Sequence, residues 1–154
     1  MVKIEQVIKL REKTSAGVME CRKALEETKG DEKKAEELLK KWGVEKAEKK
    51  TGRSTNAGII DSYIHGEGKV GVILELLCET DFVARTEDFK KLSHELCLQV
   101  ASMKPKDVKI LLSQEYIRDP SVKIGDLVKQ TIGKLGENIT LSRFTRFSLT
   151  DSGK

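Results

Sequence analysis

The spacing of apolar residues changes partway along this chain, and the change limits the possible folds more than any other feature of the sequence. In the first 50 residues, apolar side chains recur every three or four positions, as they do on one face of an α-helix. From residue 59 onward, β-branched and aliphatic residues instead form continuous runs, which are typical of strands. Because helices and strands do not alternate regularly as β-α-β units, the sequence predicts an α+β fold.

Three short amphipathic helices are expected in the first 43 residues. Their stripes consist of Ile4, Val7, Ile8 and Leu10, then Val18, Cys21 and Leu25, and finally Ala35, Leu38, Leu39 and Trp42. Breaks at residues 14–17 and at Gly30 separate them. Asp31 is a favourable N-cap for the third helix, and Gly43 is expected to end it. Helices this short cannot bury an apolar face alone, so we expect a compact three-helix bundle.

A polar stretch separates these helices from the strands. Residues 44–50 carry little apolar surface and are compatible with a solvated linker helix in which glutamates pair with lysines. Residues 51–56 read as a break between two units. The predicted domains are therefore residues 1–54, the helical bundle with its linker, and residues 55–154, an α+β core with an antiparallel sheet packed by helices.

A β-hairpin is expected at the start of the second domain. Residues 59–64 and 70–77 are the two strands, and the glycines in the connecting segment supply the positive φ angles of the turn. Val72, Leu74 and Leu76 share one face of the second strand. Ile73 and Leu77 lie on the other face, which predicts a strand covered on both sides.

Two helices and a last strand complete the predicted core. The first helix carries an apolar stripe that ends before Pro105, and the second begins at about Ser121. Residues 138–149 form a strand whose alternation slips near Arg143, as a β-bulge would cause. The stripe residues are Phe89, Leu92, Leu96, Val100 and Met103 in the first helix and Leu127, Val128, Thr131, Ile132 and Leu135 in the second.

The short segment after the second strand admits two interpretations. Thr80, Asp81, Phe82 and Val83 stand where an apolar strand turns into a helix. In the first interpretation Thr80 or Asp81 caps the helix and Phe82 is a core anchor. In the second, the acid and the phenylalanine project from a rigid turn into a partner. The tetrapeptide alone favours the structural interpretation.

The charge balance does not favour nucleic acid as a partner. The chain has 29 basic and 25 acidic residues, a net charge of +4 without a strongly basic segment. Sequence-independent binding to nucleic acid relies on many clustered basic side chains. No signal peptide and no apolar run long enough for a membrane span are present, so we expect a cytoplasmic protein with reduced thiols and no membrane partner.

Neither a metal centre nor a catalytic site is expected. The three cysteines lack a CxxC pair, and neither His65 nor His94 has a second ligand at helical spacing. His94 and Cys97 share a helix, but such a pair is more often incidental than catalytic. The glycines at 66 and 68 lack the rest of a phosphate-binding loop. We therefore expect no cofactor and no enzymatic activity.

Three separated motifs closely resemble the bacterial elongation factor Ts family, whose members are nucleotide-exchange factors for elongation factor Tu. They are residues 10–25 (LREKTSAGVMECRKAL), residues 75–85 (ELLCETDFVAR), and residues 134–139 (KLGENI) followed by Arg143-Phe144 and Arg146-Phe147. Small departures from the family pattern occur at Ser15, Arg22 and Leu77. The chain is similar to short family members with one core subdomain, some of which form homodimers.

The resemblance implies a guanine-nucleotide exchange factor that binds GDP-bound elongation factor Tu. The bundle is then similar to a ubiquitin-associated domain that docks on the partner, with Arg11, Val18 and Met19 as contact residues. Asp81 and Phe82 are expected to intrude near the partner's magnesium and phosphate site. Thr80 and Val83 complete this partner-binding segment as helix cap and anchor.

Two other functions stay open from the sequence. The first is a non-catalytic interaction adaptor, in which the bundle binds a peptide or a ubiquitin-like partner. The second is nucleic-acid binding through the alternating basic and aromatic residues of the last strand, which could stack on bases. In an alternating strand these residues divide more simply between a buried and an exposed face. The members of that set are Arg143, Phe144, Arg146 and Phe147.

Overall fold

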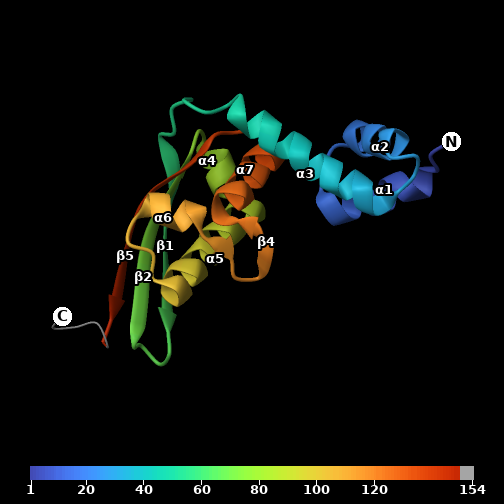
Figure 1. Cartoon of the computed structure of the whole chain (residues 1–154). Coiled ribbons are helices and arrows are strands. Elements are labelled where there is room, and N and C mark those ends of the chain that lie inside the picture. Colours follow the sequence, from blue (N-terminus) through green and yellow to red (C-terminus); the bar gives the residue numbers. More distant parts are fainter. Residues whose placement is uncertain (150–154) are drawn as a thin grey trace.

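A helical bundle stands at one end of the molecule, a sheet covered by helices forms the other end, and one long helix joins them (Figure 1). The computed structural model describes residues 1–149; residues 150–154, the last part of the second predicted domain, lie outside the described residues. The elements are α1 (Ile4–Thr14), α2 (Val18–Glu27), α3 (Glu32–Glu48), β1 (Ala57–His65), β2 (Val70–Cys78), α4 (Asp81–Ala84), α5 (Glu87–Met103), α6 (Val108–Ser113), β3 (Glu115–Tyr116), β4 (Asp119–Lys123), α7 (Ile124–Leu135) and β5 (Ile139–Ser148). The predicted α+β class is confirmed.

The bundle consists of α1, α2 and the first half of α3 around a small core of its own. Its buried side chains are Val7, Leu10, Cys21, Ala24, Leu25, Ala35 and Leu39. Asp31 accepts a hydrogen bond from the Lys34 amide at 3.1 Å, so it caps α3 as predicted. The predicted stripe on α1 is wrong for Ile4 and Ile8, which are exposed. These two residues share a stripe of the helix that is turned toward solvent.

Helix α3 does not end at Gly43, as the sequence predicted, but continues to Glu48 and buries Ala47 in the second core. Its second half packs along α7 at a pair of glycines. A Cβ on Gly133 would lie 2.5 Å from the carbonyl oxygen and 2.7 Å from the Cα of Gly43, so the two helix backbones are very close. Glycine within a helix costs only about 1 kcal/mol relative to alanine, and packing readily offsets that cost. Residues 44–48 of the expected linker are therefore part of α3, where Ala47 is buried and Glu45, Lys46 and Glu48 are exposed.

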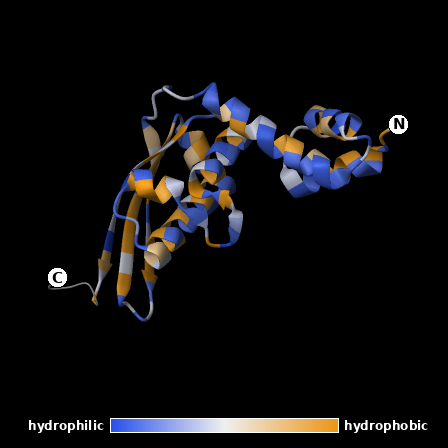
Figure 2. Cartoon of the chain, viewed as in Figure 1, coloured by the Kyte–Doolittle hydropathy of each residue, from blue (hydrophilic) through white to orange (hydrophobic). Residues whose placement is uncertain are grey.

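A three-stranded antiparallel sheet with β2 at its centre forms the second end of the molecule. Val72, Leu74 and Leu76 are buried, as the alternation of β2 predicts. The prediction that β2 is covered on both sides is wrong, because Ile73 on the opposite face is 57% exposed. The larger helices of this part all lie on one side of the sheet, and Figure 2 shows hydrophobic residues along its strands.

The last strand contains the expected bulge. Glu75 of β2 pairs with Arg143 and the next residue, Leu76, pairs with Leu141, so Ser142 is an extra residue in β5. Beyond the bulge the alternation continues to Ser148, and each face of the strand receives one basic and one aromatic residue. Phe144 and Arg146 are half-buried, whereas Arg143 and Phe147 are exposed.

Helix α5 crosses the inner face of the sheet and ends before Pro105, as predicted. Two features of the helical layer were not predicted: the short helix α6, and the small β3–β4 hairpin that delays the start of α7 to Ile124. A buried side chain of α5 holds this hairpin. Gln99 donates to the Glu115 carbonyl at 3.0 Å and accepts from the Ile117 amide at 3.1 Å. Both features were missed because segments this short carry no clear periodicity.

Candidate partner-binding site

Helix α4 is a four-residue helix whose side chains divide between solvent and core. Asp81 and Phe82 are exposed, Phe82 to 81%, whereas Val83 and Ala84 are 5% and 4% exposed. Thr80 is the N-cap and its hydroxyl accepts from the Val83 amide at 3.3 Å, which confirms the predicted capping role. The alternative in which Phe82 is a core anchor is wrong, because Val83 and Ala84 fill that position.

Every polar group of Thr80 has a partner. Its amide donates to Oε1 of Glu137 at 2.9 Å, and its hydroxyl donates to Oε2 of the same carboxylate at 2.7 Å. Its carbonyl accepts from the Ala84 amide at 3.2 Å and from the Cys78 thiol at 3.1 Å. Burial, then the carboxylates of Glu137 and Asp81, raises the pKa of this thiol, so it stays a protonated donor. Thr80 is therefore held by hydrogen bonds to Glu137, Ala84 and Cys78.

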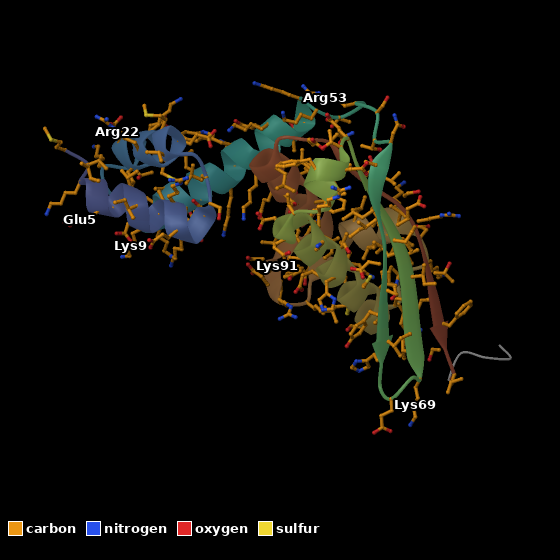
Figure 3. The ribbon with its side chains drawn as sticks, turned by 180° about the vertical axis from the view of Figure 1, so that it is seen from behind. Glu5, Lys9, Arg22, Arg53, Lys69 and Lys91 are labelled. Carbon is orange, nitrogen blue, oxygen red and sulfur yellow. The ribbon has the colours of Figure 1, made fainter. Side chains whose placement is uncertain are left out.

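A second contact joins the same two segments, the one after β2 and the one before β5, but here the segment after β2 supplies the carboxylate. Oε1 of Glu79 accepts from the Asn138 amide at 2.9 Å, and the Asn138 side chain donates to the Arg53 carbonyl at 2.9 Å. The Arg53 guanidinium lies 3.6 Å from the Glu79 carboxylate. Arg53 stands at the end of the sheet opposite the hairpin turn that carries Lys69 (Figure 3). These contacts tie the linker, the end of β2 and the start of β5 together beside α4.

The other predicted contact residues lie in the bundle. Val18 and Met19 begin α2 and are 47% and 71% exposed. Arg11 lies in the last turn of α1 and is also exposed. The structure does not bring these residues close to Phe82, because α1 and α2 stand at the far end of α3 from α4 (Figure 1). The candidate site therefore has two separate parts on one continuous scaffold.

Burial, followed by the Asp61 carboxylate, raises the pKa of the Cys97 thiol to about 12, so the pair with His94 offers no ready nucleophile. Within residues 1–149, no three acidic, histidine or cysteine side chains come together as metal ligands. The helices of the same residues include none that is both long and apolar enough to cross a membrane.

Sequence reasoning missed the residues around α4 that fix its position. Glu79, Glu137 and Asn138 were parts of motifs without an individual role. The signal was their position, because Glu79 directly follows β2 and Glu137 lies two residues before β5. It becomes meaningful only when the register places Cys78 opposite Ile139, which no local pattern specifies.

The similarity of the chain to known proteins covers both parts of the fold. Residues 79–153 match the family model described as "Elongation factor TS". The chain is 44% identical to elongation factor Ts of Coprothermobacter proteolyticus, with 93% of this chain and 95% of the relative covered. It is 42% identical to elongation factor Ts of Thermotoga neapolitana, with 99% of both covered. It is 40% identical to elongation factor Ts of Rippkaea orientalis, with 96% of this chain and 78% of the relative covered. The chain belongs to the elongation factor Ts family.

Proposed function

We propose that this protein is a guanine-nucleotide exchange factor that binds GDP-bound elongation factor Tu and promotes GDP release during translation elongation. Family membership supports this function. The observation that carries it is the 81% exposure of Phe82 on a turn in which Thr80 is hydrogen-bonded and Val83 and Ala84 are buried. An exposed aromatic side chain on a fixed backbone is the kind of anchor that dominates protein interfaces.

In the proposed mechanism Asp81 and Phe82 enter the partner near its magnesium and phosphate site. Magnesium requires nearly ideal octahedral oxygen geometry, so a small displacement of the surrounding helices weakens its binding. Thr80 and Val83 contribute by holding the turn from the protein side. Binding of this protein and binding of nucleotide then weaken each other by the same factor, because coupling between two binding sites is reciprocal. No covalent bond is made or broken, so the protein is not an enzyme in that sense.

The energy required means that Phe82 does not act alone. Burying one phenylalanine contributes about 1.5–3 kcal/mol. Weakening nucleotide binding by roughly 10⁴-fold requires about 5.5 kcal/mol of differential affinity. We propose that Arg11, Val18 and Met19 supply part of the remainder by docking the bundle on the partner's nucleotide-binding domain. The exposed apolar side chains of Val18 and Met19 support this role.

We further propose that residues 1–54 and 55–154 act as two functional units, a docking bundle and an exchange core. Two separate clusters of buried apolar residues support the division. Helix α3 belongs to both units, because Leu39 is buried in the first cluster and Ala47 in the second. One continuous helix of 17 residues, about 25 Å long at a rise of about 1.5 Å per residue, joins the two units.

A second copy of the chain is the proposed occupant of the open sheet face. This face carries Ile60, Ile64, Ile73 and Phe147, which are 57–75% exposed. They come from all three strands and lie around Gly71 and the Glu75–Arg143 ion pair. Several large apolar side chains exposed on one sheet face, with polar residues between them, are typical of an interaction surface. A sheet packed face to face on a second sheet would bury it, as in a β-sandwich.

The decisive experiment measures release of fluorescent GDP from purified elongation factor Tu, with and without this protein, across a range of magnesium concentrations. We expect strong acceleration by the wild-type protein and a loss of at least tenfold with Phe82→Ala, since about 1.5–3 kcal/mol of burial is removed. Ile117→Ala is the matched control, because Ile117 is also exposed but lies on the β3–β4 hairpin. Its exchange rate should equal that of the wild type.

Two results would contradict the proposal. No acceleration of GDP release by the wild-type protein would reject exchange altogether. Binding to elongation factor Tu without acceleration would instead favour the adaptor function. A wild-type rate from Phe82→Ala, with an unchanged circular dichroism spectrum, would remove Phe82 from the mechanism.

A further inference from the structure

The end of the sheet beside α4 is extended by side chains rather than by backbone pairing. The β2–β5 ladder ends where Cys78 pairs with Ile139. One residue further, the Glu79 carboxylate accepts from the Asn138 amide, and the Glu137 carboxylate accepts from the Thr80 amide. Each segment thus supplies the acceptor that the other needs, in the place where strand carbonyls would otherwise do so. Glu137 makes one additional bond, to the Thr80 hydroxyl.

We propose that Glu137 is a positioning residue for nucleotide exchange, which fixes the direction in which α4 presents Phe82 by orienting the Thr80 hydroxyl. This inference rests on the exchange function proposed above. The hydroxyl hydrogen is committed to Oε2 of Glu137, so an oxygen lone pair is left to accept from the Val83 amide. The Glu137 carboxylate, which lies just before β5, therefore orients the hydroxyl with which Thr80 caps α4.

Helix α4 needs such an external support because of its length. Four residues cannot form a stable helix on their own, since nucleation costs more than one turn of hydrogen bonds returns. Its direction is set by the burial of Val83 and Ala84 underneath and by the contacts of Thr80 at its start. Phe82 has no contact in the core to guide it. Loosening Thr80 consequently lowers the fraction of molecules in which Phe82 is ready to enter the partner, and the exchange rate falls with that fraction.

Only a carboxylate can accept from both the amide and the hydroxyl of Thr80 at this position. If glutamine replaced Glu137 with its oxygen toward the Thr80 amide, its NH₂ group would donate to the second lone pair of the hydroxyl, whose hydrogen would turn to solvent. The charge-assisted bond from the hydroxyl would then be replaced by a neutral one of opposite direction. With the amide turned the other way, two N–H donors would face each other. The charge-assisted pair of bonds is lost in either orientation, although size and shape are unchanged.

The test uses full-length Glu137→Gln in the GDP-release assay. We expect the maximal exchange rate to fall roughly tenfold, the loss typical of one hydrogen bond to a charged group. The concentration of half-maximal effect should change less than threefold, because the docking residues of the bundle are untouched. Amide hydrogen exchange at Thr80 and Val83 in the free protein should become faster. Glu87→Gln is the matched control, since its side chain is 95% exposed and pairs only loosely with Lys90 at 3.9 Å.

Two further sets of variants separate positioning from general damage. Thr80→Ser keeps the hydroxyl and should exchange faster than Thr80→Val, which should behave like Glu137→Gln. In a Phe82→Ala background, Glu137→Gln should cause no additional loss, because the carboxylate acts through Phe82. These comparisons remain informative even if one variant is unstable, because Thr80→Ser and Thr80→Val differ only at the turn.

The inference is overturned if Glu137→Gln folds and exchanges at the wild-type rate, or if its loss adds fully to that of Phe82→Ala. It is also overturned if Thr80→Val retains wild-type exchange. Failure of the exchange function itself is distinguishable, because the wild-type protein would then be inactive. In that case hydrogen exchange at Thr80 and Val83 would still report whether Glu137 orders the turn.

Discussion

Cys97 shows how strongly the core controls the chemistry of one side chain. It is fully buried in α5, and burial followed by the Asp61 carboxylate raises the pKa of its thiol to about 12. Since the thiolate is the reactive form, we expect no alkylation of Cys97 by iodoacetamide at pH 8 in the folded protein and rapid alkylation in guanidinium. Mass spectrometry of digested samples measures both. Modification of the native thiol at the unfolded rate would contradict this assignment.

The raised pKa of Cys97 also makes the stability of the fold depend on pH. An unfolded cysteine has a pKa of about 8.5, so the folded state disfavours the thiolate that high pH would create. The stabilisation from Cys97 is fully present below about pH 8.5 and is lost progressively as the pH rises toward 12. A buried thiol of this kind is a packing residue, which agrees with the absence of a nucleophile beside His94.

Among the elements, the crossing of α3 and α7 makes an asymmetric prediction. An added Cβ at Gly133 would meet the backbone of Gly43, whereas nothing lies within 4 Å of an added Cβ at Gly43. We expect Gly133→Ala to lower the free energy of unfolding by about 1–3 kcal/mol through overpacking. Gly43→Ala should be neutral or raise it by up to about 1 kcal/mol, since alanine favours the helix. Urea unfolding followed by circular dichroism compares them, and equal effects would argue against the close crossing.

Elements with long periodic patterns were predictable, whereas features that depend on contacts with distant parts of the chain were not. The stripe of α5 and the alternation of β2 identified their elements and much of their buried face, although Met103, the last residue of the α5 stripe, is 49% exposed. Gly43 reads as a helix end, and only contact with Gly133 of a distant helix explains why α3 continues. Ile73 reads as buried for a similar reason, since its neighbours do not reveal that all the larger helices lie on one face. At the candidate site, the projection of Asp81 and Phe82 followed only from the family resemblance, since the tetrapeptide alone favoured a buried Phe82, and the role of Glu137 depends on strand register.

For the molecule as a whole, the open sheet face predicts self-association. We expect sedimentation equilibrium to give a dimer at micromolar concentration, and Ile73→Lys to weaken the dimer by roughly 100-fold or more, because an ammonium group would be buried without a partner. Ile117→Lys, on the distant β3–β4 hairpin, should leave association unchanged. A monomeric wild-type protein at these concentrations would reject a second copy as the occupant of this face.

The bonds that hold the Phe82 turn also join parts of the chain that are synthesised at different times. Thr80 precedes Glu137 by 57 residues, and Glu79 precedes Asn138 by 59. At about 5–20 residues per second, a ribosome needs about 3–11 seconds to make the intervening segment. During that interval a nascent chain carries the complete sequence of the turn but none of the carboxylate contacts across it. The turn therefore acquires its final geometry only after residues 137 and 138 have been translated, and a product terminated before them would lack it.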